Sequence, residues 1–179
     1  AHWPVEAVVA LLKTGVAPGG SVTGPMAEVV FRSTQYLNDA DAQAIAVYLR
    51  ALPQRAIAPA EVVKPSAATL ERGAKVYEQH CAQCHGDNGE GKPGAFPALA
   101  GNRAVVLQDP TNLVRVVLQG GYLPATAGNP RPHGMPPFMQ VLGDDDVAAV
   151  STFVRNAWGN QAPAVGTIGV YRARERRGS

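Results

Sequence analysis

The sequence predicts an all-α fold in which short helices are joined by long loops. Apolar residues recur at the spacing of one helical face in several separate segments, and no βαβ pattern is visible. The 19 glycines and 15 prolines gather between these segments, where they interrupt helices and favour structured turns. A chain of 179 residues is long enough for one domain with a real core, or for one domain and a fragment of another.

Two helices are expected in the first 52 residues. The first carries an apolar stripe and ends at Gly15, because glycine favours the end of a helix. Asn38 and Asp39 can cap the second helix, and Pro53 stops it. The expected boundaries are Val5–Lys13 for the first helix and 40–52 for the second, with a Gly/Pro-rich loop over 17–25 between them.

A linker and a third helix follow. Residues 53–65 contain three prolines and no periodic pattern, so they are predicted to be a linker. Ser66 is the expected N-cap of a helix over residues 67–81. Gly73 inside this helix costs about 1 kcal/mol relative to alanine. A close contact with another helix would account for that cost.

The segment after this helix is expected to be mostly loop. Residues 86–102 are rich in Gly and Pro and carry no helical period. A helix then begins at Asp109 or Thr111, either of which can cap it, and runs to about Gln119. Gly120 and its neighbour end this helix.

The last part of the chain is expected to hold one more long helix. A second Gly/Pro-rich loop covers residues 124–137. Three aspartates, 144–146, then place negative charge at the start of a helix through about Trp158, which is favourable for its dipole. They mark a helix start rather than a metal site, and Trp158 is expected to lie in the core or at the edge of a bound group. Residues 161–179 are rich in arginine and are expected to form a solvated basic tail with at most one short helix.

The stretch between His80 and Gly86 contains the pattern Cys-x-x-Cys-His, at Cys81, Cys84 and His85. This pattern is typical of covalent attachment of a c-type haem. The two thiols can form thioether bonds to the haem vinyl groups, because two intervening residues place the sulfur atoms one helical turn apart. His85 follows directly, so its imidazole can reach the iron as proximal ligand. The sequence therefore predicts one covalent haem c.

Two other interpretations of the paired cysteines are weaker. A structural zinc site needs four ligands and usually a second cysteine pair, whereas this chain has only two cysteines. A redox-active Cys-x-x-Cys disulfide does not need the adjacent histidine, and it usually follows a strand in a βαβ unit.

Residues 5–52 resemble residues 110–157 when the sequence is shifted by 105 residues. Each copy has a Gly/Pro loop with a methionine, but only the second copy follows a Cys-x-x-Cys-His motif. The chain is therefore expected to hold the back half of one haem domain followed by a complete one. The matching blocks are residues 9–15 with 114–120, Asp39-Ala40-Asp41 with Asp144-Asp145-Asp146, and Tyr48-Leu49-Arg50 with Phe153-Val154-Arg155. The expected organisation is a partial domain over 1–52, a linker over 53–65, a complete haem domain over 66–160 and a basic tail over 161–179.

The surroundings of the motif carry a family resemblance. The residues concerned are Gly73, Tyr77, Cys81, Cys84, His85, Phe96-Pro97-Ala98-Leu99, Gly134-Met135-Pro136 and Phe153. In this pattern the chain resembles class I cytochromes c, most closely the multihaem cytochrome c subunits of bacterial membrane-associated dehydrogenases for alcohols, sugars and sugar acids. The resemblance covers residues 66–158 as a full domain and 5–52 as a partial one. It implies a cytochrome c-like fold of short helices and long loops around a haem.

The resemblance also implies roles for individual residues. Met135 would be the distal iron ligand opposite His85. Pro97 would accept a hydrogen bond from Nδ1 of His85 and fix the ring, and Leu99 would pack on the haem face. Gly73 and Tyr77 would meet Phe153 where the first and last helices of the domain cross.

Other side chains compete for the distal position. Met139 is the main alternative, but Met135 has the Gly-Met-Pro setting and Met139 has the features of a wall or core residue. His80 adjoins the motif and His133 lies two residues from Met135, so geometry disfavours both as sixth ligands. A solvated histidine is the expected role for each.

Composition narrows the classes of function. The formal net charge of +2 argues against a nucleic-acid role and gives no strong attraction to membranes. No apolar run approaches the ~20 residues of a membrane span. The sequence starts at Ala1 without an initiator methionine or signal peptide, so either a leader has been removed or the sequence is a piece of a longer one.

The expected function is electron transfer rather than catalysis. An iron with both axial positions filled has no open site for substrate, and the sequence contains no constellation of general acid, base or nucleophile. The expected role is to relay single electrons from a dehydrogenase catalytic subunit to quinone, a terminal oxidase or another carrier. The periplasm or the outer face of the cytoplasmic membrane is the expected location, because thioether attachment is made there in the proteins that this chain resembles. The alternative is a haem enzyme or ligand sensor with a displaceable sixth ligand.

Met26 is a separate question. In a complete domain, a methionine in this loop reaches an iron held by an upstream motif, and nothing upstream of Met26 can attach a haem. We therefore expect Met26 to bind no iron held by its own chain. It should be exposed beside a gap of haem size, or lie against a haem from a separate polypeptide.

Overall fold

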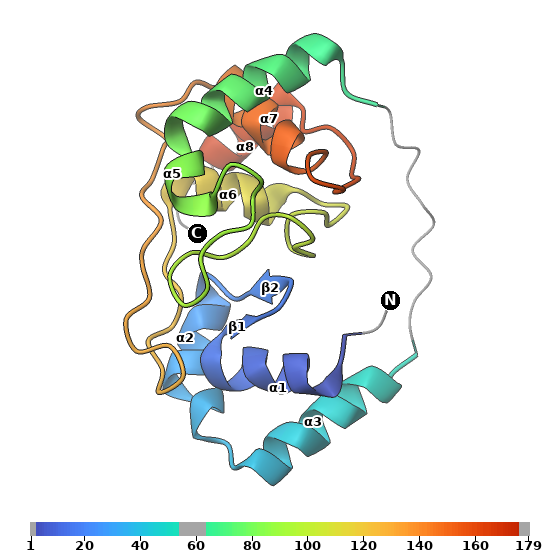
Figure 1. Cartoon of the computed structure of the whole chain (residues 1–179), viewed down its shortest axis with the longest axis vertical. Helices are drawn as coiled ribbons and strands as arrows, with labels where there is room; N and C mark the ends of the chain where they lie inside the picture. The colour runs from blue at the N-terminus through green and yellow to red at the C-terminus, as the bar shows by residue number, and fades with distance from the viewer. Residues whose placement is uncertain (1–2, 54–63, 176–179) are drawn as a thin grey trace. The chain divides into compact units, whose positions relative to one another are not determined.

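A computed structural model describes residues 3–53 and 64–175 of the chain. Eight α-helices, one short 3-10 helix and one two-stranded hairpin form the regular structure of these residues (Figure 1). The prediction of an all-α fold is confirmed for this part of the chain. None of its helices is both long and apolar enough to cross a membrane. The expected linker over 53–65 lies almost entirely outside the described residues.

The chain divides into two compact units. Of the described residues, unit 1 comprises 3–53 and 122–134, and unit 2 comprises 64–121 and 135–175. Residues 122–134, which form most of the second Gly/Pro loop, belong to unit 1. That loop meets the end of the first helix. A side chain at Gly15 would collide with the ring of Pro124, and the Thr126 hydroxyl donates to the Thr14 carbonyl over 3.5 Å.

Unit 1 contains both helices expected in it. The first ends at Gly15 in the left-handed conformation, with φ of 76°. The second is capped by the Asn38 side chain, which accepts a hydrogen bond from the Asp41 backbone N–H over 2.8 Å. The elements are α1 (Val5–Thr14), β1 (Val16–Ala17), β2 (Gly20–Ser21), α2 (Pro25–Arg32), η1 (Thr34–Tyr36) and α3 (Asp39–Ala51).

The helix α2 is not anticipated by the sequence. The sequence predicts a loop over 17–25 and no helix after it, and the N-cap residue is Gly24, which has no side chain to form a cap. Pro25 at the first position suits a helix start, and Val30 is 2% exposed, so tertiary packing stabilises this short helix. Met26 lies in its first turn and is 53% exposed.

Unit 2 contains the remaining helices. Its first helix is capped as predicted, since the Ser66 hydroxyl accepts from the Thr69 backbone N–H over 3.1 Å. Asp109 accepts hydrogen bonds from the Thr111 N–H and hydroxyl at the start of another, and these bonds lower the pKa of its carboxyl. The elements are α4 (Ala67–His80), α5 (Ala82–His85), α6 (Thr111–Gln119), α7 (Asp144–Val154) and α8 (Thr167–Glu175).

The core of unit 2 forms where α4, α6, α7 and α8 meet. The closest approach is between α4 and α7. An added Cβ at Gly73 would lie 2.2 Å from the Ala149 carbonyl oxygen and 2.6 Å from Cβ of Phe153. One turn further along α4, the Tyr77 ring lies 5.5 Å from the Phe153 ring, centroid to centroid. The crossing implied for Gly73, Tyr77 and Phe153 is therefore present.

Substitution of Gly73 by alanine should lower the free energy of unfolding of unit 2. We expect a loss of about 2 kcal/mol, because overpacking costs roughly 1–3 kcal/mol or more while alanine in a helix returns up to about 1 kcal/mol. Gly169→Ala in α8 is the matched control, since no atom lies within 4 Å of its added Cβ. That variant should be neutral or slightly stabilised in the same urea titration. Equal midpoints for the two variants would contradict the tight crossing.

Two features at the end of the chain differ from expectation. The helix α7 ends at Val154 rather than near Trp158, which instead adopts a left-handed φ of 53°. Its ring packs 4.9 Å from Tyr77 and 5.5 Å from Phe153 between centroids, so it is a core contact as expected. The sequence predicts a solvated tail with at most one short helix; α8 is such a helix, but it buries Val170 and Ala173 in the core of unit 2. The burial of apolar residues at helical spacing docks α8 in spite of the arginines in this segment. The last two of these arginines lie outside the described residues.

Candidate haem-binding site

The Cys-x-x-Cys-His motif lies where one helix ends and a short second helix begins. The helix α4 ends at His80, Cys81 adopts an extended φ of −122°, and the next four residues form α5. The backbone N–H groups of Cys84 and His85 both donate to the Cys81 carbonyl, over 3.1 and 2.9 Å. Both cysteines are free thiols of intermediate exposure. Burial, with a smaller effect of Cys84, raises the pKa of Cys81 to about 11.

One hydrogen bond holds the His85 ring, at the nitrogen that would face away from a bound iron. Its Nδ1 lies 2.9 Å from the Pro97 carbonyl oxygen. A carbonyl can only accept, so Nδ1 carries a proton, and in the neutral ring Nε2 then keeps its lone pair. Burial lowers the pKa of this histidine, which favours the neutral ring that a metal needs. Two free thiols beside a neutral, oriented imidazole fit a covalently bound haem.

The loop after the motif is anchored so that Pro97 reaches His85. The backbone N–H of Gly91 donates to the His85 carbonyl over 2.7 Å, and that of Leu99 donates to the Gly89 carbonyl over 2.7 Å. At the start of the loop, the Tyr77 hydroxyl donates to the Gly86 carbonyl over 2.6 Å. Leu99 is partly buried and packs against the core of unit 2.

Met135 lies on a loop that is tied to the end of α6. Its backbone pairs with Gly121 in both directions, with N···O distances of 2.8 and 3.1 Å. This approach requires glycine at position 120, which has φ of 73° and where a Cβ would lie 2.4 Å from the Met135 carbonyl oxygen. The next turn is tied as well, since Met139 N–H donates to the Leu118 carbonyl over 3.1 Å. Met135 is half-buried, while Met139 packs against the core of unit 2.

The other candidate ligands have different surroundings. His80 is exposed and its ring lies 6.0 Å from that of Phe138 in an edge-on contact. His133 is exposed and belongs to the segment that clusters with unit 1. The three aspartates at the start of α7 make ion pairs or hydrogen bonds, with Arg72, Thr167 and Arg174 as partners.

Sequence analysis missed the role of Arg155. This side chain is fully buried and donates to three backbone carbonyls, those of Val105 at 2.7 Å, Leu107 at 2.8 Å and Pro163 at 3.0 Å. Burial lowers its pKa, and nearby Asp109 opposes that effect. Arg155 thereby joins the end of α7 to the segment that leads into α6. The sequence carries little evidence for this role, because Arg155 stands out only as one residue of the internal repeat.

Comparison with known proteins identifies the class. The cytochrome c family model matches residues 70–158. Over 91 residues the chain is 38% identical to cytochrome c-552 of Thermus thermophilus, covering 49% of this chain and 69% of that protein. The chain therefore belongs to the cytochrome c family, and the predicted family and cytochrome c-like fold class are confirmed. Family membership implies a covalent haem c.

Longer relatives are cytochrome subunits of dehydrogenases. The chain is 38% identical over 178 residues to the cytochrome c subunit of alcohol dehydrogenase (quinone) from Gluconacetobacter polyoxogenes, covering 93% of this chain and 37% of that protein. It is 31% identical over 198 residues to the fructose dehydrogenase cytochrome subunit of Gluconobacter japonicus, covering 96% of this chain and 40% of that protein. The chain thus spans well under half the length of these relatives. The resemblance to dehydrogenase cytochrome c subunits is confirmed.

Proposed function

We propose that this chain is an electron-transfer cytochrome c with one haem, held by Cys81 and Cys84 and ligated by His85 and Met135. The observation that carries the proposal is the buried His85 ring, whose Nδ1 lies 2.9 Å from the Pro97 carbonyl oxygen so that Nε2 is the nitrogen available to an iron. The group supplies a reversible one-electron change at iron. Cys81 and Cys84 would hold it covalently, and the Pro97 carbonyl would orient the proximal His85 ring.

Met135 is preferred to Met139 as the distal ligand because of what surrounds each side chain. Both side chains are half-buried, but Met139 packs on the hydrophobic core, whereas Met135 lies outside that core and its backbone pairs with Gly121 after α6. A thioether ligand stabilises the ferrous iron and raises the reduction potential, as suits an electron carrier. With both axial positions filled, the iron has no open position for substrate.

The partners follow from the relatives. We propose that the chain accepts single electrons from a dehydrogenase catalytic subunit and passes them to quinone, a terminal oxidase or another carrier. Cytochrome subunits of alcohol, fructose and gluconate dehydrogenases, each similar along more than nine-tenths of this chain, support this role. The proposed location is the periplasm or the outer face of the cytoplasmic membrane, where thioether attachment is made.

We further propose that residues 1–52 are the back part of a second cytochrome c-like domain. A shift of 105 residues brings Asp39 at the start of α3 onto Asp144 at the start of α7. The same shift brings buried Ala42 onto buried Val147. The shift of 105 residues does not bring Met26 onto Met135. Met26 is exposed on α2, and we propose that it binds no iron held by this chain.

The proposed function has a direct spectroscopic test. Intact mass of the purified protein should exceed that of the apo-chain by one haem, and the oxidised protein should show the weak far-red band of methionine-ligated iron. The reduced protein should not bind carbon monoxide. Carbon monoxide binding to the unmodified protein would favour the alternative, a haem enzyme or sensor with a displaceable ligand.

Removal of both attachment thiols should abolish covalent retention of the haem. In the double variant Cys81→Ala, Cys84→Ala, mass under denaturing conditions should equal that of the apo-chain, because no thioether bond can form. A single cysteine should retain the group through one bond with a shifted reduced absorption band. Two haems in the unmodified chain would contradict the proposed stoichiometry.

A further inference from the structure

Two parts of unit 2 hold the loop that carries Met135. On one side, backbone hydrogen bonds join the loop to α6 at Gly121, Val117 and Leu118. On the other side lies α8, beyond the residues that the cytochrome c family model matches. Val170 and Ala173 of α8 are buried, so this helix is docked.

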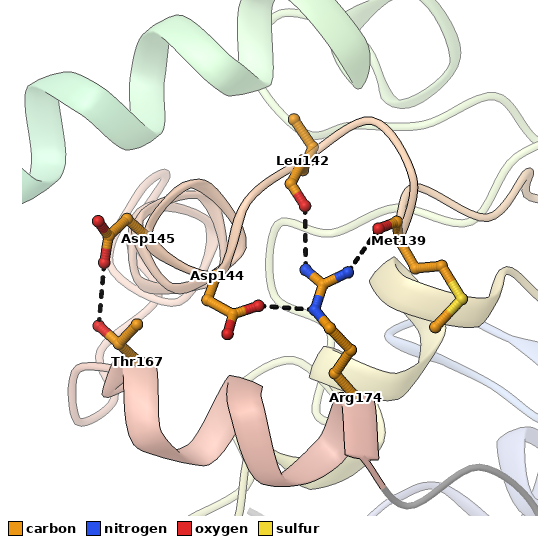
Figure 2. Close-up of polar contacts among 6 residues, drawn as sticks. All are labelled: Met139, Leu142, Asp144, Asp145, Thr167 and Arg174. Atoms are coloured by element: carbon orange, nitrogen blue, oxygen red, sulfur yellow. Dashed lines mark hydrogen bonds and ion pairs between the residues drawn. The ribbon is translucent and has the colours of Figure 1, made fainter.

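One side chain of α8 reaches the loop. Arg174 donates from Nε to the Asp144 carboxylate over 2.7 Å and from Nη2 to the Leu142 carbonyl over 3.0 Å. Its Nη1 donates to the carbonyl of Met139. Figure 2 shows the guanidinium between these three acceptors, with the loop on one side and the start of α7 on the other. The Arg174 side chain is 24% exposed, so water competes only partly with these bonds.

The acceptors sit where the loop turns into α7. The N–H groups of Val141 and Leu142 both donate to the Phe138 carbonyl, which forms a turn. The carbonyls of Met139 and Leu142 then point to Arg174 rather than into a helix. A planar guanidinium can serve two carbonyls and a carboxylate at once in a fixed geometry, and a lysine ammonium matches this arrangement poorly.

We propose that Arg174 is a positioning residue for the methionine loop, and that α8 acts through it to hold Met135 at the iron. The proposal rests on the proposed ligation by Met135. Arg174 fixes the loop four and seven residues after Met135, while the Gly121 pairing fixes it at Met135 itself. Loss of the hydrogen bonds from Arg174 should let the loop open while the rest of unit 2 stays folded.

Competition by added imidazole for the ferric iron tests this role. We expect Arg174→Ala to bind imidazole about tenfold more tightly than the unmodified protein, because loss of charge-assisted hydrogen bonds favours the open loop. Arg172→Ala is the matched control, since Arg172 is exposed on the same helix, and its imidazole affinity should be unchanged. Asp144→Asn, which retains both carbonyl acceptors, should have a smaller effect than Arg174→Ala.

The outcomes separate this proposal from the ligation on which it rests. A far-red band in the unmodified protein, with equal imidazole affinity in Arg174→Ala and Arg172→Ala, would overturn the role of Arg174 and leave Met135 as ligand. Absence of that band from the unmodified protein would overturn the ligation itself. If Arg174→Ala does not fold, Arg174→Lys supplies the test, through faster amide hydrogen exchange at residues 135–142 than in Arg172→Ala. Equal exchange there would also overturn the proposal.

Discussion

Replacement of Met135 by alanine should remove the far-red band of the oxidised protein and let the reduced protein bind carbon monoxide. The reduction potential should fall by on the order of 0.1 V or more, within the roughly 0.8 V range that axial ligands set in haem proteins. The reason is that a thioether stabilises the ferrous state, and water or an empty position does not. Optical spectra, carbon monoxide titration and potentiometry measure the three effects.

Met139→Ala is the matched control for this experiment. Met139 packs on the core of unit 2 and is partly buried, so its loss should lower the free energy of unfolding by roughly 2 kcal/mol. The far-red band and the potential should stay close to those of the unmodified protein. If Met135→Ala retains the band while Met139→Ala loses it, the distal ligand is Met139.

Local signals in the sequence predicted most helices because the interactions that start and end them are local. Ser66 and Asn38 cap the helices that they precede, and Gly15 ends α1 in a left-handed turn. The haem motif is equally local, since its two cysteines for thioether attachment and its histidine for the iron lie within five residues. The crossing at Gly73 was predictable for another reason: a glycine in a helix has a cost that a close contact explains.

The missed elements depend on contacts between distant parts of the chain. The helix α2 has no side-chain cap, and the packing of Val30 stabilises it. For α8 the sequence allows a short helix in the tail but not its docking, because the arginines of this segment suggest water as their partner. Arg174 instead binds Asp144, 30 residues away, together with two loop carbonyls. Composition cannot distinguish a solvated arginine from one whose partners lie elsewhere in the fold.

Arg155 is the clearest example of this limit, and its removal should have the largest effect on stability. Arg155→Met keeps much of the side-chain volume but leaves the carbonyls of Val105, Leu107 and Pro163 without their donor. An unpaired buried polar group costs roughly 1–3 kcal/mol, and removal of the buried charge offsets part of the total. We expect the free energy of unfolding of unit 2 to fall by about 3 kcal/mol.

The internal repeat supplies the matched control for Arg155. Arg50 occupies the corresponding position at the end of α3 but is exposed, so Arg50→Met should change stability by less than about 0.5 kcal/mol. Arg155→Lys should fall between the two, because an ammonium cannot reach three carbonyls in the geometry of a guanidinium. Urea unfolding of the haem-loaded protein, followed at the haem absorption band, reports on the unit that carries the motif. Equal midpoints for Arg155→Met and Arg50→Met would mean that the three carbonyls find other donors or water, and that Arg155 does not hold α7 to the segment before α6.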